Sequence, residues 1–158
     1  IPSPPDPGPT KTSYAWQRDW GEYGVHHLIQ SHPGSLFTYF FAHIWIDFEK
    51  YGYDNHPHPT KRVTWWNNSV EATLANWQFC VYHHVDATCD EDDNYTTYGE
   101  CSWGLTACEG PDGAYHAYGA KPCGMGEPDH DGTIAPYGAG SSIVFTPNLS
   151  ISALRYYF

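Results

Sequence analysis

The segment 103–118 holds the densest group of residues whose chemistry suits a binding or catalytic site. Its glycines let the backbone bend around a ligand, and its aromatic rings offer flat apolar faces on which sugar rings can stack. Its carboxylates can bind hydroxyl groups or transfer protons. The same residues also suit a turn-rich surface loop in which Trp103 fills the core, and composition alone slightly favours this structural interpretation. The candidate binding residues are Trp103, Glu109, Asp112, Tyr115 and Tyr118.

A second acidic cluster follows at residues 129–136 (DHDGTIAP). Asp131, which precedes a glycine, can lie at the lip of a pocket and hydrogen-bond a ligand. The two-residue spacing of Asp129 and Asp131 also resembles the start of a calcium loop, but the rest of an EF-hand loop is absent. A calcium-stabilised adhesive domain that uses the run 90–93 (DEDD) is therefore a weaker, third hypothesis, because most acidic runs are simply solvated.

His43 and Asp47 stand four residues apart in an apolar segment, where a helix would place them on one face. Polar side chains on a buried helix must find partners or serve a site. Two interpretations stay open for this pair. It lines a cleft, or it is a satisfied contact that fixes how the helix packs.

Charge and motifs narrow the possible partners. The 158 residues include 7 Lys and Arg against 18 Asp and Glu, which gives a net charge of −11. So acidic a chain repels phosphate backbones and anionic membrane surfaces, and we expect neither nucleic acid nor a membrane as partner. The sequence has no HExxH, CxxC, GxSxG, P-loop or GxGxxG pattern, so we expect no metal and no cofactor.

Cysteines and glycosylation sequons favour an extracellular setting. The cysteines lie in the second half of the chain among predicted loops, as the disulfides of secreted proteins often do. Their odd number leaves one thiol that is either free or paired outside this chain. We therefore expect a secreted glycoprotein with disulfides. The cysteines are Cys80, Cys89, Cys101, Cys108 and Cys123, and the three N-x-[ST] sequons begin at Asn67, Asn94 and Asn148.

The hydrophobic pattern predicts an all-α fold with long connections. Five prolines make residues 1–11 an extended arm, and a short helix is possible over 12–20. Apolar residues on nearly every face predict a helix over 35–48 that is buried on all sides. Residues 60–83 give the clearest amphipathic helix, with an apolar stripe at Trp66, Val70, Leu74, Trp77 and Val81.

The remaining segments indicate that the chain is part of a larger domain or assembly. Residues 86–142 form a Gly-, Asp- and Tyr-rich stretch without a sustained period, and Thr146-Pro147 begins a final helix. Unstructured loops of this length are rare in compact domains unless they are functional. Three helices cannot bury such a loop together with a helix that is apolar all round. The missing neighbours would be the rest of a longer precursor, another chain, or copies of this one.

Several motifs in register resemble the glycoamylase-like group of glycoside hydrolases, which includes bacterial endo-β-1,2-glucanases. The resemblance covers residues 13–158 and is carried by segments that occur in the same order in that family. These segments are 34–48 (GSLFTYFFAHIWIDF), 67–80 (NNSVEATLANWQFC), 103–113 (WGLTACEGPDG), 117–119 (AYG), 131–136 (DGTIAP) and 145–147 (FTP).

The resemblance implies that residues 12–158 are part of an (α/α)6 toroid whose complete form hydrolyses a β-glucan with inversion. In that scheme one carboxylic acid protonates the leaving oxygen and a carboxylate activates water. The family's acid glutamate and base aspartate fall outside this chain, so no catalytic residue is assigned. The residues that match the family's pocket-lining loops are His43, Asp47, Trp103, Glu109, Asp112, Tyr115, Tyr118 and Asp131.

Two hypotheses of different classes follow. The first is a segment of a secreted glycoside hydrolase that supplies substrate-binding loops to a β-glucan cleft, with β-1,2-linked glucan favoured. The alternative is a non-catalytic extracellular structural or glycan-binding subunit of an assembly, which the absent acid and base, the sequons and the proline-rich arm would suit.

Overall fold

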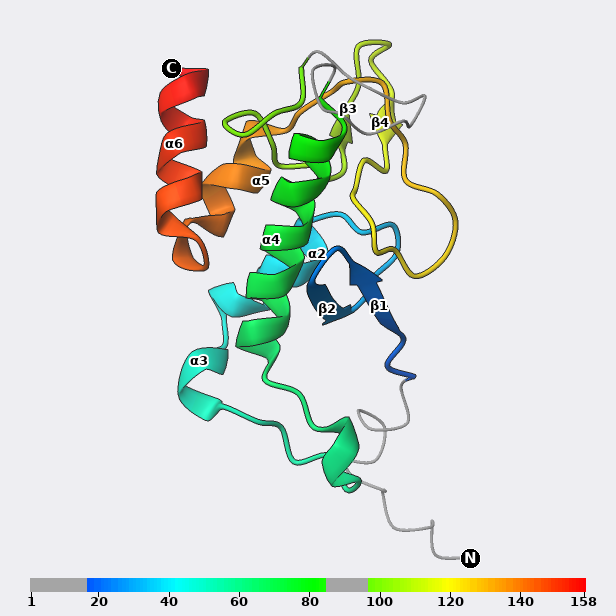
Figure 1. Cartoon of the computed structure of the whole chain (residues 1–158), viewed down its shortest axis with the longest axis vertical. Helices are drawn as coiled ribbons and strands as arrows, with labels where there is room; N and C mark the ends of the chain where they lie inside the picture. The colour runs from blue at the N-terminus through cyan, green and yellow to red at the C-terminus, as the bar shows by residue number, and fades with distance from the viewer. Residues whose placement is uncertain (1–16, 85–96) are drawn as a thin grey trace, which may run out of the picture.

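The computed structural model of the chain describes residues 17–84 and 97–158 (Figure 1). The proline-rich arm at 1–11, Cys89, the acidic run at 90–93 and Asn94 lie outside these residues. The described elements, in chain order, are β1 Trp20–Tyr23, β2 His26–Ile29, α2 Phe37–Phe40, η1 Phe41–Ile44, α3 Phe48–Tyr51, η2 Pro59–Lys61, α4 Trp65–Tyr82, β3 Cys108–Glu109, β4 Tyr115–His116, α5 Pro136–Ser141, η3 Ser142–Val144 and α6 Pro147–Tyr157.

The longest helix, α4, runs through the middle of the structure and confirms the predicted amphipathic helix except at its start (Figure 1). The expected beginning near residue 60 is wrong. Val63 is instead bonded to Asp54: the Asp54 amide donates to the Val63 carbonyl at 2.9 Å, and the Val63 amide donates to Asp54 Oδ1 at 3.3 Å. Arg62 and Thr64 on either side are extended, after the 3₁₀ turn η2. The helix can therefore begin only at Trp65.

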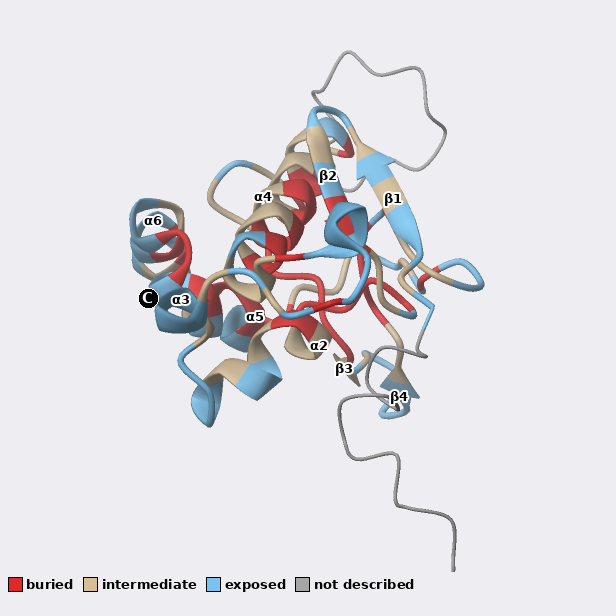
Figure 2. Ribbon diagram, turned by 90° about the horizontal axis from the view of Figure 1, so that it is seen from below, coloured by how far each residue is buried: buried red, intermediate tan, exposed pale blue. Residues whose placement is uncertain are grey.

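The buried face of α4 differs from the predicted stripe. The five apolar stripe residues are only partly buried, whereas small and polar residues on another face are covered by the rest of the chain. Figure 2 shows buried residues along the inner side of α4 and in the segments that pack there. Small side chains let neighbouring backbone approach the helix closely, so it is backbone rather than side chains that fills much of this interface.

Two asparagines hold that backbone. Asn68 accepts a hydrogen bond from the Ile29 amide at 2.7 Å and donates to the Ile29 carbonyl at 3.2 Å. Two helical turns further on, Asn76 accepts from the Leu105 amide and donates to the Leu105 carbonyl, both at 3.0 Å. Each side-chain amide thereby satisfies both polar groups of one buried peptide position, and α4 is tied to β2 at one point and to the 103–113 loop at another.

The predicted helix over 35–48 is wrong as a single element. It is divided into α2, the 3₁₀ turn η1 and, after a break, α3. The Ser35 hydroxyl donates to the Tyr118 carbonyl instead of capping a helix, and Asp47 caps α3 by accepting from the Lys50 amide at 3.1 Å. The expected burial on every side is also wrong for the described residues, because Trp45 is 78% exposed.

Two small antiparallel sheets correct the all-α prediction, although helices predominate. β1 pairs with β2 from Trp20↔Ile29 to Tyr23↔His26, so the described end of the predicted 12–20 helix is a strand. The second sheet joins β3 to β4 within the stretch that shows no sequence period. The described residues do not by themselves form a complete toroid.

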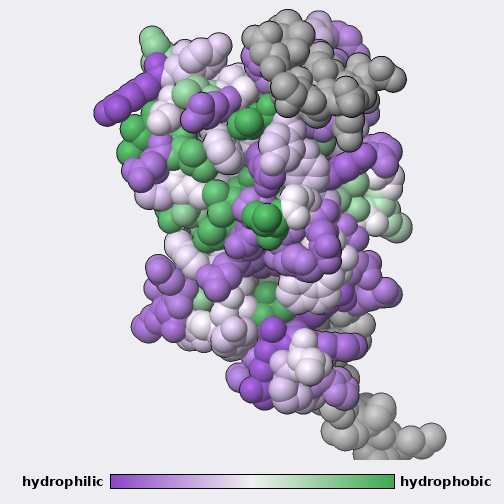
Figure 3. Space-filling view, in the orientation of Figure 1, coloured by the Kyte–Doolittle hydropathy of each residue, from purple (hydrophilic) through white to green (hydrophobic). Residues whose placement is uncertain are grey.

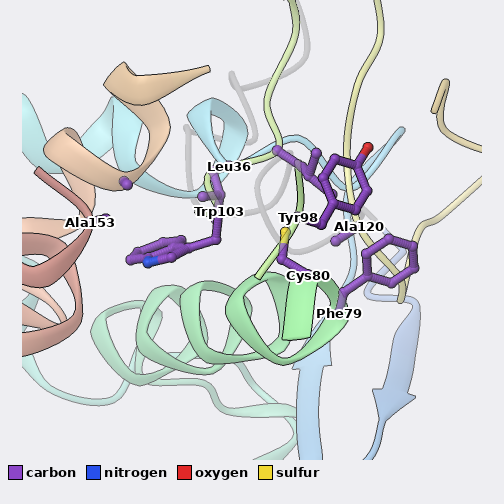
Figure 4. Close-up of a cluster of buried hydrophobic side chains, with 9 residues drawn as sticks. Leu36, Phe79, Cys80, Tyr98, Trp103, Ala120 and Ala153 are labelled. Carbon is purple, nitrogen blue, oxygen red and sulfur yellow. The ribbon is translucent and has the colours of Figure 1, made fainter. Parts of the chain in front are cut away.

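The main core cluster extends along α4, from Trp103 and Ala153 beside α6 to Phe79, Tyr98 and Ala120 (Figure 4). Its largest member is Trp103, which is 0% exposed and whose backbone is held by Tyr157: the phenol donates to the Trp103 carbonyl at 2.5 Å and accepts from its amide at 2.9 Å. The next residue, Gly104, has a φ of +115° and packs so closely that a Cβ would lie 2.7 Å from the Ala139 nitrogen. Trp103 therefore fills the core, as the structural interpretation of this loop predicted.

The final helix α6 begins at Pro147, as predicted, and packs against α5. The four cysteines among the described residues, Cys80, Cys101, Cys108 and Cys123, are free thiols, so no predicted disulfide is found among them. In the described part of the chain, no helix combines the length and the apolar character that crossing a membrane requires.

Replacing Asn76 with leucine should lower the free energy of unfolding by about 1–3 kcal/mol, because it leaves the buried Leu105 amide without a partner and the Leu105 carbonyl with only the Leu36 amide. Urea denaturation followed by circular dichroism measures the change. Asn67→Ala, at an exposed position of the same helix, is the matched control and should change stability by less than about 0.5 kcal/mol. Equal effects of the two substitutions would contradict the role given to Asn76.

Candidate functional site: an acidic hairpin

Five of the eight predicted binding residues gather on or beside the β3–β4 hairpin. Glu109 and Tyr115 face each other across the two strands, and Asp112 lies in the turn that joins them. Three hydrogen bonds close the turn. The Gly110 amide donates to the Ala114 carbonyl at 2.8 Å, the Gly113 amide to the Gly110 carbonyl at 3.0 Å, and the Ala114 amide to Asp112 Oδ1 at 3.0 Å. Tyr115 is 73% exposed, so its ring is presented to solvent beside the acidic residues.

His116 links this hairpin to the segment that follows it. Its Nε2 lies 2.9 Å from Asp112 Oδ1, and its Nδ1 lies 3.6 Å from Asp129 Oδ2. Asp129 Oδ2 also accepts from the Ala117 amide at 2.9 Å. We call Asp112, His116 and Asp129 the histidine clamp, because they join the turn, strand β4 and the 129–133 segment.

Protonation strengthens the clamp. The hydrogen bond that His116 donates to Asp112, followed by the charges of the neighbouring carboxylates, raises the pKa of His116. Hydrogen bonds from the Ala114 amide and from His116 lower the pKa of Asp112. An imidazolium between carboxylates is thus the favoured state of this exposed cluster at mildly acidic pH.

Tyr118 and Asp131 form a second contact beside the clamp. The buried Tyr118 phenol donates to Asp131 Oδ2 at 2.6 Å, and Asp131 Oδ1 accepts from the Thr133 amide at 2.9 Å. Burial and the hydrogen bond to Asp131 raise the pKa of Tyr118 to about 12. Burial disfavours the charge on Asp131, but hydrogen bonds from Thr133 and Tyr118 outweigh it and lower its pKa. Tyr118 therefore remains a donor to an ionised Asp131.

The base of the hairpin is fixed by residues that the sequence analysis did not single out. Tyr137, in α5, donates to the Ala107 carbonyl at 2.7 Å, and its hydroxyl lies 3.1 Å from Thr106 Oγ1. Thr106 Oγ1 also accepts from the Phe37 amide at 3.1 Å. His116 and Asp129 were likewise missed as site residues, although the Asp112-x-x-x-His116 and Asp129-x-Asp131 spacings were available as signals.

The remaining three predicted residues lie elsewhere. Trp103 is in the core, and the proposed His43–Asp47 pair does not form, because the two side chains bind different partners. His43 Nε2 lies 2.9 Å from Ser69 Oγ and its ring packs between Phe145 and Phe48, while Asp47 caps α3. Burial lowers the pKa of His43, which keeps the ring neutral. The interpretation as a satisfied His–Asp contact is therefore wrong. His43 lines a pocket between β2, the α2–η1 segment and α4, and Asp47 does not.

The structure describes two of the three predicted glycosylation sequons. Of the sequon asparagines, Asn67 in α4 and Asn148 in α6 are exposed, and glycosylation at these positions stays a prediction. Within residues 17–84 and 97–158, no three His, Cys, Asp or Glu side chains are grouped so that they could hold a metal ion.

A family model described as "Glycoamylase: Putative glucoamylase" matches residues 1–158. The chain belongs to this family. This confirms the resemblance drawn from the helix and loop motifs. Strand β3, Asp112, Tyr118 and Asp131 fall in segments that carried it, and β4 lies between two of those segments.

The relatives of this glycoamylase-family chain include β-1,2-glucan hydrolases. It is 30% identical over 129 residues to an exo β-1,2-glucooligosaccharide sophorohydrolase (non-reducing end) of Parabacteroides distasonis, covering 81% of this chain and 15% of that protein. An endo-β-1,2-glucanase structure from Chitinophaga pinensis, a complex with sophorotriose and glucose, is similar with a TM-score of 0.65 and 26% identity, over 89% of this chain and 30% of that one. A β-1,2-glucanase structure from Parabacteroides distasonis is similar with a TM-score of 0.57 and 28% identity, over 78% of this chain and 15% of that one.

The chain thus spans between 15% and 30% of the lengths of these relatives. Its likeness to them supports the interpretation as part of a glycoside hydrolase of the β-glucan type.

The histidine clamp predicts a specific pH response. His116, whose folded pKa is raised, stabilises the clamp below its unfolded pKa, and this contribution is lost as pH rises through the folded value. Asp112, whose pKa is depressed, contributes above its unfolded pKa and loses that contribution as pH falls through the folded value. In an NMR titration of the His116 ring, Asp112→Asn should lower the pKa of His116. Asp47→Asn, which removes a carboxylate that caps α3, is the control, and a His116 pKa that responds equally to both substitutions would refute the clamp.

Proposed function

We propose that the chain is the glucan-binding part of a secreted glycoside hydrolase and that the β3–β4 hairpin contacts the sugar. The observation that carries this proposal is the position of Tyr115, an exposed ring on a hairpin whose neighbouring carboxylates are held in place from both sides. The activities of the relatives named above favour β-1,2-linked glucan as the substrate.

The hairpin offers the two kinds of contact that a glucose unit needs. Tyr115 presents an apolar face against which the C–H face of a sugar ring can pack. Asp112 and Asp131 accept hydrogen bonds from the protein, yet a carboxylate has about four lone-pair sites, so each can also accept from sugar hydroxyls. Since these acceptors are already oriented by the protein, binding costs little ordering of side chains.

The lowered pKa values of Asp112 and Asp131 argue that these carboxylates position the substrate and do not act as its general acid. A general acid in an inverting mechanism has a raised pKa so that it is protonated at working pH. The pKa values of Asp112 and Asp131 are both lowered. We therefore infer that neither Asp112 nor Asp131 is the general acid. The family resemblance places both the acid and the base in the remaining part of the domain, so we propose that hydrolysis needs that part.

Uncovered apolar surface supports that need for a partner. Trp45 and Ile44 are largely exposed, and the apolar stripe of α4 is only partly covered. Figure 3 shows apolar residues over α4 and α6 on one face of the molecule. We propose that the remaining part of the same domain packs on this surface. A stable homopolymer in size-exclusion chromatography with light scattering would instead favour the structural-subunit alternative.

Tyr115→Ala should weaken the binding of a β-1,2-linked gluco-oligosaccharide about tenfold, equivalent to about 1.4 kcal/mol, because it removes the stacking face. Isothermal titration calorimetry with sophorotriose measures the loss. Tyr51→Ala, at another exposed tyrosine that lies in α3, is the matched control and should leave the affinity unchanged. The binding proposal fails if wild-type protein takes up no sophorotriose or if both variants bind as well as it does.

Catalysis is tested separately by release of reducing sugar from β-1,2-glucan. We expect no release by the 158-residue chain and release by a longer form that includes the remaining part of the domain. An inert longer form would contradict the hydrolase assignment, and an active 158-residue chain would contradict the inference that the acid and base lie outside it.

A further inference from the structure

The β3–β4 hairpin is too small to hold its own shape. Each strand has two residues, and the two strands pair only with each other. An isolated two-stranded hairpin is at best marginally stable in water. The positions of Tyr115 and Asp112, which the proposed function places against the sugar, therefore depend on side chains that brace the turn.

The His116 ring is one of these braces, because it packs directly against the turn. A Cβ built on Gly110 would lie 2.7 Å from His116 Cδ2 and 2.5 Å from the Tyr118 hydroxyl, so the turn backbone rests on these two rings. The His116 and Tyr118 rings lie beside each other, with centroids 5.4 Å apart. His116 also follows Tyr115 directly in β4, so the ring that braces the turn and the ring proposed to meet the sugar belong to adjacent residues.

The two ring nitrogens of His116 face carboxylates from two different segments. Nε2 lies 2.9 Å from Asp112 Oδ1 in the turn, and Nδ1 lies 3.6 Å from Asp129 Oδ2 in the segment beyond β4. The charge of Asp131, in the same segment as Asp129, also acts on the ring. Neutral imidazole has one donor and one acceptor, so only the protonated ring presents an N–H group to both carboxylates.

Loss of the proton therefore breaks the histidine clamp on one side. The remaining N–H stays on Nε2, which makes the shorter contact, and the lone pair of Nδ1 then faces the Asp129 carboxylate. That contact changes from attraction between opposite charges to repulsion between a lone pair and an anion. The carboxylates around the ring also lose the cation between them, so His116 no longer holds the turn to the 129–133 segment.

Four other titratable groups around His116 keep one charge state from mildly acidic to mildly alkaline pH. Cys108 lies opposite His116 in the ladder, and burial raises the pKa of its thiol. The pKa of Tyr118 is raised to about 12 by burial and by its hydrogen bond to Asp131. Hydrogen bonds lower the pKa values of Asp112 and Asp131, which therefore stay ionised.

Two further groups near the clamp have other neighbours. His130 stands between the two aspartates in the sequence, but its ring stacks on Phe79, with centroids 5.0 Å apart, and its Nδ1 lies 3.2 Å from the Tyr98 hydroxyl. Glu109 faces Tyr115 across the ladder and adds negative charge to the hairpin. A substitution at His116 separates its proton from that of His130.

From this arrangement we propose that His116 is a positioning residue whose proton couples sugar binding at the hairpin to pH. The protonated ring holds Asp112 and Tyr115 in the arrangement that meets the sugar, and the neutral ring holds them less firmly, so binding weakens. This inference rests on the proposed function, because it concerns the regulation of the same surface. Binding is strongest at mildly acidic pH and falls as pH rises through the folded pKa of His116, which its carboxylate partners raise.

Isothermal titration calorimetry with sophorotriose at about pH 5.5 and about pH 8.5, on either side of the range in which histidine titrates, tests the inference. We expect the wild type to bind about threefold more tightly at the lower pH, because an exposed ion pair contributes an effect of this size. His116→Gln, which takes up no proton, should bind with the weaker affinity at both pH values. His116→Arg, which keeps the charge and has donors for both carboxylates, should bind with the tighter affinity at both.

His27→Gln is the matched control. His27 is an exposed histidine of β2 whose Nε2 lies 3.0 Å from Glu22 Oε1, outside the hairpin. Its substitution removes a histidine–carboxylate pair of the same kind and should leave the threefold ratio unchanged.

A second measurement uses the reciprocity of linked equilibria. If the protonated ring favours sugar binding, bound sugar must favour the protonated ring by the same factor. An NMR titration of the His116 ring in saturating sophorotriose should therefore show a midpoint about 0.5 pH unit higher than in the free protein, which corresponds to a threefold change in affinity.

The outcomes separate this inference from the hairpin proposal. Equal wild-type affinities at the two pH values, or a pH dependence that persists in His116→Gln, would overturn the role of His116 and leave the hairpin proposal intact. Loss of the pH dependence in His27→Gln would place the controlling proton elsewhere and would also overturn it. Absence of sophorotriose binding at both pH values would overturn the proposed function, and this inference with it.

Discussion

The structure depends on α4 holding two backbone segments through side-chain amides. Asn68 and Asn76 lie eight residues apart in the helix and each satisfies both polar groups of one buried residue, Ile29 and Leu105. A buried peptide group without a partner costs of the order of 1–3 kcal/mol, so these contacts tolerate few substitutes. Because the surrounding residues of α4 are small, the backbone can approach closely enough for the amides to reach it. These polar contacts act beside the apolar packing of Phe79 and Cys80, which lie in the main core cluster.

The glucan-binding proposal rests on this constraint. Leu105 lies between Trp103, which the core and Tyr157 hold, and Thr106, which α2 and Tyr137 contact. The chain therefore enters β3 from a fixed point, and the histidine clamp and the Tyr118–Asp131 contact fix the far side of the hairpin. The irregular stretch is consequently ordered by long-range hydrogen bonds, and the carboxylates and Tyr115 are carried on it in a definite arrangement. A loop that is ordered before it meets its ligand loses little entropy on binding.

Short-range sequence patterns predicted the helices whose formation depends on neighbouring residues. The periodic apolar residues revealed α4, and Thr146-Pro147 marked the start of α6. The order of the family motifs identified the family. Five residues of the acidic and aromatic clusters gather on or beside the β3–β4 hairpin, and their role in binding stays a prediction. Contacts between segments far apart in the chain could not be predicted from local sequence. The Ser35 hydroxyl donates to the Tyr118 carbonyl instead of capping a helix. Trp20–Tyr23 is a strand because His26–Ile29 pairs with it. Asn68 and Asn76 were overlooked because apolar residues were assumed to define the buried face of α4.

Amide hydrogen exchange in the native protein tests the central claim most directly. If the asparagines of α4 hold the structure together, the Ile29 and Leu105 amides should exchange only through global unfolding and be among the slowest in the chain. The Ala114 amide in the exposed hairpin turn should exchange much faster. Exchange of Leu105 at a rate close to that of Ala114 would show that the loop is not anchored to α4 and would contradict the account.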